Sequence, residues 1–335
     1  MKKVFHFVPS LDIGGVEIAI KKSLPDLKQK LDISIFYIKR RGSLDVGQKP
    51  WWLALKSIVF RRPDVVITSL WWSHPIGFLF KISGIRWVCF IHNSRFKHFV
   101  DRFICSLSIW YSDEVAADSN QAAVFVRLIR KDAFVRVIPY VFLLTHKEIE
   151  VKRVKNTFIY VGRNASEKRM DLVAGFFEHL MTKFPAVRCR FEIAGEVPIT
   201  VLNLKNAFGD RVSVKSNSSN TEVYEKLSSS EYFVVLSDLE GFCMSAYEAV
   251  QAGCFVIYRD VGEIKNYVIP DRSFRVIDLE NLYDQFDEVL EARNKAGAVK
   301  SFIPPAESLG NNIDTYNYRF IDMVESRQTN SKGDR

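Results

Sequence analysis

Residues 238–253 of this 335-residue chain read DLEGFCMSAYEAVQAG, and they follow a short apolar run at Tyr232–Leu236. The apolar run predicts a buried strand, and the residues after it predict a short loop followed by a helix. Glu240 falls in the loop and Glu248 falls inside the helix, while Gly253 can end the helix in the left-handed conformation of a C-cap. The stretch therefore predicts a strand–loop–helix unit that carries two carboxylates near the helix start.

The start of this expected helix presents backbone N–H groups that attract anions. These groups belong to Phe242, Cys243, Met244 and Ser245. A diphosphate or a sugar hydroxyl suits that position, and Glu248 suits the two vicinal hydroxyls of a ribose, as acidic residues do in dinucleotide-binding folds. Taken alone, each carboxylate could also be an ordinary solvated charge, and that alternative stays open on this evidence.

Outward from this unit, the chain alternates short β-branched or aromatic runs with amphipathic stretches of helical period. The clearest helix is Lys168–Phe184, with Ser166 as its expected N-cap. The alternation predicts parallel sheets covered by helices on both faces, and twelve strands are too many for one comfortable sheet. We therefore expect an α/β protein with two Rossmann-like domains that face each other across a cleft. The expected strands are Val4–Val8, Ile33–Ile38, Val65–Leu70, Trp87–Ile91, Glu114–Ala117, Val135–Ile138, Phe158–Val161, Arg190–Ala194, Val212–Lys215, Tyr232–Leu236, Phe255–Tyr258 and Phe274–Ile277.

The domain boundary is expected in the charged stretch His146–Lys155, which lacks a core pattern. Residues 1–150 then form the N-terminal domain, and residues 151–328 form the C-terminal domain. The last helix of the second domain can pack back on the first. The polar residues 329–335 are expected to be a disordered tail.

The composition, with 47% hydrophobic and 26% charged residues, is that of a globular protein and excludes a fibrous or disordered chain. No apolar run reaches the 18 or so residues of a membrane span, and the N-terminus reads as a strand and turn rather than a signal peptide. The odd number of cysteines without a CxxC pair predicts buried free thiols and a cytoplasmic protein. These cysteines are Cys89, Cys105, Cys189, Cys243 and Cys254.

Charge is unevenly distributed along the chain. Residues 1–150 carry 23 basic and 13 acidic side chains, whereas residues 151–335 carry 24 and 26. A basic first half predicts an anionic partner, either nucleic acid or anionic lipid. In residues 49–62, a helix would place Trp52, Leu55 and Val59 on one face, as in an interfacial membrane helix. An ordinary core helix is the favoured alternative for that segment.

Three further segments place polar residues where strands end. Gly14 and Gly15 follow the first strand and let backbone approach a phosphate, although an ordinary turn explains them equally well. Arg163 and Lys168 flank a strand–helix turn and could neutralise a diphosphate, or could be surface cations. His92 ends a strand of the first domain and so falls at the cleft, although a lone histidine is more often structural.

The run that begins at Glu240 resembles the E-x7-E signature of retaining GT-B glycosyltransferases, especially family 4, the glycosyl transferases group 1. Asp12 to Glu17 resembles the family's G-G-x-E loop, and Gly162 to Lys168 resembles its G-R-x4-K segment. Tyr140-Val141 and Val261-Gly262 depart from the family pattern. The matching residues are Glu240, Gly241, Phe242, Cys243, Glu248, Ala249, Ala252 and Gly253.

The resemblance implies the GT-B fold and retaining transfer of a hexose from a UDP- or GDP-linked sugar to a saccharide acceptor. It also implies that residues 1–150 are the acceptor-binding domain and residues 151–328 the nucleotide-sugar-binding domain. It implies a metal-independent enzyme without a cofactor, and the sequence has no D-x-D. Together with the basic first half, it favours a lipid-linked acceptor in bacterial surface-polysaccharide assembly (lipopolysaccharide, O-antigen or capsule) and a peripheral position on the inner face of the cytoplasmic membrane. The implied catalytic residues are Glu240, His92, Arg163 and Lys168, and the implied donor-binding residues are Gly14, Gly15, Arg163, Lys168, Phe242, Cys243, Met244, Ser245 and Glu248.

Three other functions remain open on the sequence. A nucleotide-sugar isomerase on the same fold would convert the donor without an acceptor. A basic nucleic-acid-binding protein fits the pI of about 9.1, although helix-turn-helix, zinc-finger and RNA-recognition signatures are missing from the sequence. A degenerate, non-catalytic domain is disfavoured because both carboxylates and both cations are intact.

Overall fold

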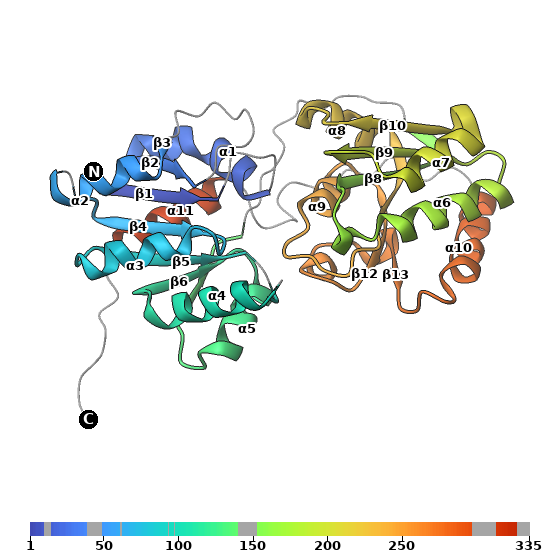
Figure 1. Ribbon diagram of the computed structural model, residues 1–335. Coiled ribbons are helices and arrows are strands. Elements are labelled where there is room, and N and C mark those ends of the chain that lie inside the picture. The colour runs from blue at the N-terminus through green and yellow to red at the C-terminus, as the bar shows by residue number, and fades with distance from the viewer. Residues whose placement is uncertain are drawn as a thin grey trace. The chain divides into compact units, whose positions relative to one another are not determined.

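The computed structural model describes residues 1–9, 15–38, 49–60, 62–92, 94–96, 98–139, 153–296 and 313–326. The chain divides into two compact units (Figure 1). Unit 1 combines Met1–Phe142 with Asn311–Arg335, and unit 2 spans Leu143–Gly310. The expected boundary near residue 150, the Tyr140-Val141 departure and the expected tail at 329–335 all lie outside the described residues.

Unit 1 is built on a seven-stranded parallel sheet with the strand order β3-β2-β1-β4-β5-β6-β7. Strands such as β4 and β6 are buried along their whole length, because helices cover both faces of a parallel sheet. The strands are β1 Lys3–Val8, β2 Asp32–Tyr37, β3 Lys49–Pro50, β4 Val65–Ser69, β5 Arg86–Ile91, β6 Glu114–Ala117 and β7 Val135–Val137, and the helices between them are α1 Gly15–Lys30, α2 Trp52–Phe60, α3 His74–Ile82, α4 Phe99–Tyr111 and α5 Asn120–Ile129.

Unit 2 is built on a six-stranded parallel sheet with the strand order β10-β9-β8-β11-β12-β13. The chain moves outward from β8 in one direction, then returns to the other side of β8 with β11. The loops after β8 and β11 therefore flank a topological switch point, which is where ligands bind in open α/β sheets. The elements are β8 Val154–Arg163, α6 Met170–Lys183, β9 Arg188–Ala194, α7 Ile199–Phe208, β10 Val212–Ser216, α8 Asn220–Ser228, β11 Ser230–Val235, α9 Met244–Gln251, β12 Phe255–Arg259, β13 Ser273–Val276 and α10 Leu282–Ala296.

All twelve expected strands form, and β3 is an additional short edge strand. Two expectations about unit 2 are wrong. Val154 and Lys155 belong to β8 rather than to a linker. Ser166 does not cap a helix: Ser166–Lys168 forms a separate 3-10 turn, and α6 begins only after Arg169, which adopts the left-handed conformation at φ 47°. The reason is tertiary, because this turn is hydrogen-bonded to the loop after β11.

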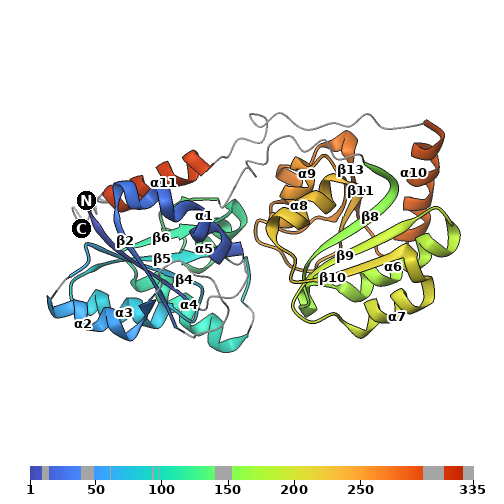
Figure 2. The ribbon, with the colours of Figure 1, turned by 90° about the horizontal axis from the view of Figure 1, so that it is seen from above.

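The last helix, α11 (Ile313–Glu325), packs on unit 1 beside α1 (Figure 2). Cations from the unit 1 sheet meet its C-terminal carbonyl groups. Lys2 Nζ donates to the carbonyl of Val324 at 3.2 Å, and Arg86 donates to the same carbonyl at 3.0 Å and to that of Met323 at 2.8 Å. Positive charge at this end also complements the helix dipole, so α11 is bound both by packing and by electrostatics.

Replacing Arg136 with methionine is expected to loosen this attachment. Arg136 forms ion pairs with Asp322 of α11 and with the buried Glu114, which also pairs with Arg86. Arg86 would still pair with Glu114, so the loss is smaller than for a buried charge that has no partner at all. We expect the free energy of unfolding to fall by about 2 kcal/mol. Urea denaturation measures this, with the exposed Arg188→Met in unit 2 as the control. Equal midpoints for the two variants would contradict the expectation.

Within residues 49–62, α2 packs against the core of unit 1, which agrees with the favoured alternative of a core helix. Ala54 of α2 is fully buried, and Leu53 and Leu55 pack against the core of unit 1. Trp52 is 50% exposed, so it does not share the buried face. Of the described residues, none forms a helix that is both long and apolar enough to span a bilayer.

All five cysteines are buried and carry free thiols, which confirms the expectation of buried free thiols. Burial disfavours the thiolate and therefore raises the pKa of these groups, to about 11 for Cys254. The cysteines consequently act as small core side chains at neutral pH.

Candidate active site

The candidate site of unit 2 is the loop between β11 and α9, at the carboxyl ends of the parallel strands. Its central side chain, Glu240, is only 7% exposed. Lys168 Nζ lies 2.7 Å from Glu240 Oε1 and 2.6 Å from Oε2, and the Ser237 hydroxyl donates to Oε1 at 2.7 Å. A carboxylate that accepts charge-assisted bonds on both oxygens is held in a single orientation. The structure thus brings together two of the residues that the sequence singled out.

The loop after β8 is fastened to the loop after β11 by two further interactions. The backbone N–H of Asp238 donates to the Glu167 carbonyl at 2.8 Å, and Arg169 Nη1 lies 3.3 Å from Asp238 Oδ2. Arg259 forms a second ion pair with Asp238. Burial acts to raise the pKa of Asp238, but the hydrogen bonds from Arg259 and Arg169 outweigh it and hold that pKa below its usual value. This ionised carboxylate fixes the 3-10 turn that carries Lys168.

Gly262 lies directly against the same loop. A Cβ atom at Gly262 would come within 2.1 Å of the Gly241 carbonyl oxygen and 3.0 Å of Glu240 Cβ, and its φ of 60° favours glycine. The backbone N–H of Glu263 donates to that carbonyl of Gly241 at 3.0 Å. Gly262 belongs to the segment that departs from the family pattern. It makes a close backbone contact with the loop that carries Glu240, and this contact fixes the position of that loop.

The helix that follows starts at a strained residue. Cys243 adopts φ 59° as the residue before α9, so the helix begins at Met244 rather than at Phe242. The Tyr267 hydroxyl lies 2.9 Å from the carbonyl oxygens of both Phe242 and Cys243. Burial, and then the charge of Glu240, raise the pKa of Cys243 to about 12, so its thiol is protonated and unsuited to act as a nucleophile.

The remaining expected residues of unit 2 are less enclosed. Met244 and Ser245 occupy the first turn of α9 and are partly exposed, and Glu248 is a half-buried residue one turn further on. Gly253 has φ 75° just after the end of the helix, as expected for a C-cap.

Arg163 is the last residue of β8, with a side chain 53% exposed and 3.7 Å from Glu167. A surface pair of this kind holds Arg163 weakly, which leaves it able to turn towards a ligand.

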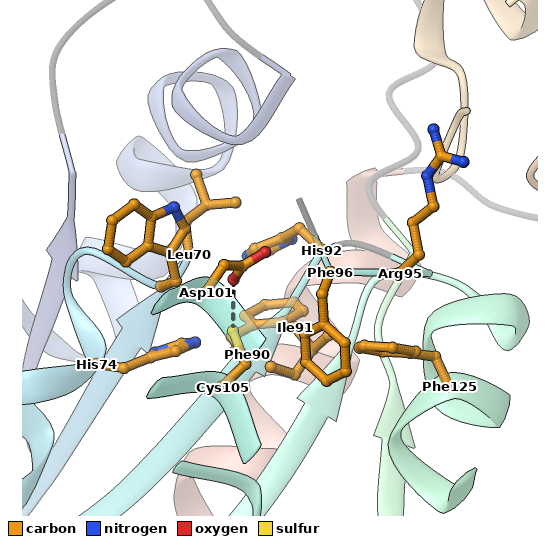
Figure 3. A pocket seen from close by; sticks show the side chains of 11 residues that line it. Leu70, His74, Phe90, Ile91, His92, Arg95, Phe96, Asp101, Cys105 and Phe125 are labelled. Carbon is orange, nitrogen blue, oxygen red and sulfur yellow. Dashed lines mark hydrogen bonds between the residues drawn. The ribbon is translucent and has the colours of Figure 1, made fainter. Parts of the chain in front are cut away.

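In unit 1, His92 follows directly after β5 and is 7% exposed. Its Nδ1 lies 3.2 Å from Asp118 Oδ2, and its ring lies 4.5 Å from that of Phe90, measured between centroids. His92 lines a pocket of mixed character, to which Arg95 and the buried Asp101 also contribute (Figure 3). The expected loop residue Gly14 lies outside the described residues, and Gly15 is the first residue of α1.

Two further buried histidines lie near His92. His6 Nε2 is 2.8 Å from the Ser69 hydroxyl, and His74 Nδ1 is 2.9 Å from the Thr68 hydroxyl. Burial, reinforced by His92, lowers the pKa of both to about 3, so they are neutral at physiological pH. Neither is evident from the sequence, because an isolated histidine in an apolar strand, such as His6, or at the start of a helix, such as His74, gives no functional signal.

Sequence reasoning also missed Ser237, Asp238 as an anchor, Tyr267 and Asp118. The partners of Asp238, Tyr267 and Asp118 are distant in the sequence, whereas Ser237 contacts the nearby Glu240 but is a common loop residue that gives no signal of its own. Within the described part of the chain, no group of three or more His, Cys, Asp and Glu side chains could hold a metal ion.

The two parallel sheets, each covered by helices, form the GT-B fold. Residues 144–301 match the family model of glycosyl transferases group 1. The match lies within unit 2, so this unit is similar to the glycosyltransferases of that family, family 4. A search of curated protein sequences finds no significant match.

Solved structures of low sequence identity share the fold over nearly their whole length. Sucrose-phosphate synthase from Thermosynechococcus elongatus superposes with a TM-score of 0.72 at 15% identity, covering 96% of this chain and 98% of that one. The glycosyltransferase WaaG, involved in lipopolysaccharide biosynthesis, gives 0.73 at 11% identity, covering 97% and 100%. TarM gives 0.76 at 11% identity, covering 97% and 99%.

Proposed function

We propose that this enzyme moves a hexose, with retention of configuration, from a UDP- or GDP-linked sugar to a lipid-linked saccharide during bacterial surface-polysaccharide assembly. The observation that carries the donor half is the Lys168–Glu240 pair at the switch point of unit 2. The acceptor half is supported by the basic first half of the chain. It is also supported by the likeness to WaaG and to WaaB, a lipopolysaccharide outer core galactosyltransferase.

In the proposed reaction, the bond between the anomeric carbon and the diphosphate breaks as the acceptor hydroxyl attacks. Negative charge develops on the departing diphosphate, and preorganised cations stabilise it. Arg163, which is exposed and weakly held, reaches the diphosphate, while Lys168 adds positive charge beside it. The N–H groups of Met244 and Ser245 at the start of α9 contribute to the same task.

Glu240 is the residue we assign to the hydroxyl groups of the donor sugar. Its carboxylate is held in one orientation by Lys168 and Ser237, which suits it to bind a sugar hydroxyl in a fixed position. Glu248, half-buried on α9, is assigned to the ribose hydroxyls. Acceptor binding is assigned to unit 1, where Asp118 holds the His92 ring at the end of β5.

Binding of nucleotides tests the donor site directly. We expect one nucleoside diphosphate, UDP or GDP, to raise the unfolding temperature, because a ligand at about 100 times its Kd adds roughly 2.7 kcal/mol. Glu248→Ala should lose most of this shift, whereas Glu225→Ala, an exposed residue of neighbouring α8, should keep it. Thermal unfolding across a panel of nucleotides and nucleotide sugars measures both. If neither nucleotide shifts the wild-type protein, the proposed donor site is wrong.

A further inference from the structure

The outward side of α4 is apolar, which is the reverse of an ordinary surface helix. Phe99 is 79% exposed, Phe103 59% and Trp110 54%. The buried side of the same helix instead carries Asp101, Cys105, Ser108 and Ile109. Core packing therefore does not explain the large aromatic residues, because the side that faces the core is the more polar one.

Helix α5 and the loop after it continue this surface. Val124 is 55% exposed, Leu128 78% and Phe134 60%. The ends of the two helices are joined, because the Arg130 guanidinium lies 5.7 Å from the centre of the Trp110 ring. Figure 1 shows α4 and α5 side by side at the lower edge of unit 1. We call this surface the α4–α5 face; it comprises Phe99, Val100, Phe103, Trp110, Tyr111, Val124, Leu128 and Phe134.

Unit 2 provides an internal comparison. Its exposed large hydrophobic side chains, among the described residues, are Val154, Ile199, Leu202 and Ile277, and none is aromatic. A surface that gathers five exposed aromatic rings, four on α4 and one on the loop after α5, is therefore specific to unit 1 among the described residues. Contiguous exposed apolar patches of this kind mark interaction sites.

The charged residues around the α4–α5 face indicate what kind of partner binds there. Arg102, Arg127 and Lys131 are exposed on the same segments. Between residues 98 and 139 the one described carboxylate that is largely exposed, Asp132, lies 3.5 Å from Arg130. Exposed aromatic residues flanked by cations are complementary to an anionic bilayer surface, where Trp and Tyr favour the interface and Lys and Arg meet the headgroups.

We propose that the α4–α5 face docks unit 1 on an anionic lipid bilayer. The inference deepens the proposed function, since a lipid-linked acceptor would be presented at such a surface. A second copy of the chain is a poorer occupant, because two identical faces would bring like charges together. This contact site lies outside residues 49–62, the segment that the sequence offered as an interfacial helix with a core helix as the favoured alternative; Leu53 and Leu55 of that segment pack against the core of unit 1.

Vesicle flotation tests the proposal. We expect the wild-type protein to float with vesicles of phosphatidylcholine and phosphatidylglycerol, and far less with phosphatidylcholine alone. The double variant Phe103→Ser, Trp110→Ser should bind at least about tenfold more weakly, because two large apolar groups no longer enter the interface. The matched control, Ile199→Ser with Leu202→Ser on α7, should bind as the wild type does. Circular dichroism confirms that all three proteins are folded.

Three results would overturn the docking site: no flotation of the wild type, unchanged flotation of the double variant, or a dimer that the double variant abolishes in sedimentation without vesicles. The last result would assign the face to self-association. The nucleotide-dependent thermal shift, measured on the same proteins without lipid, should persist in the double variant. Loss of vesicle binding with an intact nucleotide shift therefore separates failure of the docking site from failure of the donor site.

Discussion

Glu240→Gln is expected to lower the rate of sugar transfer at least about a hundredfold. Glutamine keeps the size of the side chain but removes the charge that binds Lys168 through both carboxylate oxygens. The loss of one preorganised electrostatic contact in an active site typically costs a factor of about 10²–10³ in kcat. The assay is transfer, or donor hydrolysis without acceptor, with the nucleotide sugar that binding experiments identify.

Lys168, the ion-pair partner of Glu240, provides a second test of this prediction. Lys168→Met should also reduce the rate, and the double variant should lose much less than the product of the two single losses, because the two side chains form one unit. Glu196→Gln, an exposed carboxylate of the same unit, is the control and should keep full activity. A Glu240→Gln enzyme that retained half of the wild-type rate would exclude Glu240 from the reaction.

Gly262→Ala is expected to remove activity through the backbone rather than through any functional group. The added methyl would lie 2.1 Å from the Gly241 carbonyl oxygen, so the loop that carries Glu240 must move. Strain at positive φ together with overpacking should lower the free energy of unfolding by about 2–5 kcal/mol. Chemical denaturation and the transfer assay measure the two effects on the same preparation.

Gly209→Ala is the matched control for this substitution. Gly209 has a similar φ of 56°, but an added Cβ there would meet no atom within 4 Å. Its variant should therefore show only the cost of its positive-φ backbone conformation (φ 56°, ψ −126°), about 1–3 kcal/mol, with normal activity. Equal losses in the two variants would mean that the contact between Gly262 and the Glu240 loop is unimportant.

Local patterns were sufficient for most of the fold. Buried parallel strands are continuous apolar runs, so each of the twelve expected strands could be found from its own residues. The additional strand, β3, has only two residues and gives no such signal. The 3-10 turn at Ser166–Lys168 was missed because its conformation depends on a hydrogen bond to Asp238, about seventy residues later in the chain.

The candidate site was also predictable only in part from the sequence. Sequence alone placed Glu240 on a loop after a strand and Lys168 at the start of a helix, and both fall in segments that resemble a family pattern. The contact between them depends on the adjacency of β8 and β11, which is a property of the sheet order. The Tyr267 hydroxyl supports the loop through the Phe242 carbonyl, which lies 25 residues earlier in the chain, so no local pattern encodes this contact.

The sequence by itself determined the class of fold, the two carboxylates and two cations of unit 2, and a basic first half. Periodicity and spacing encode these features within short segments, where they can be read directly. Only the tertiary structure decided that α11 binds to unit 1 and that α4 turns its aromatic side outward. Which side of a helix is buried depends on neighbours brought together from distant parts of the chain, and an apolar stripe looks the same in the sequence whether it faces a core or the solvent.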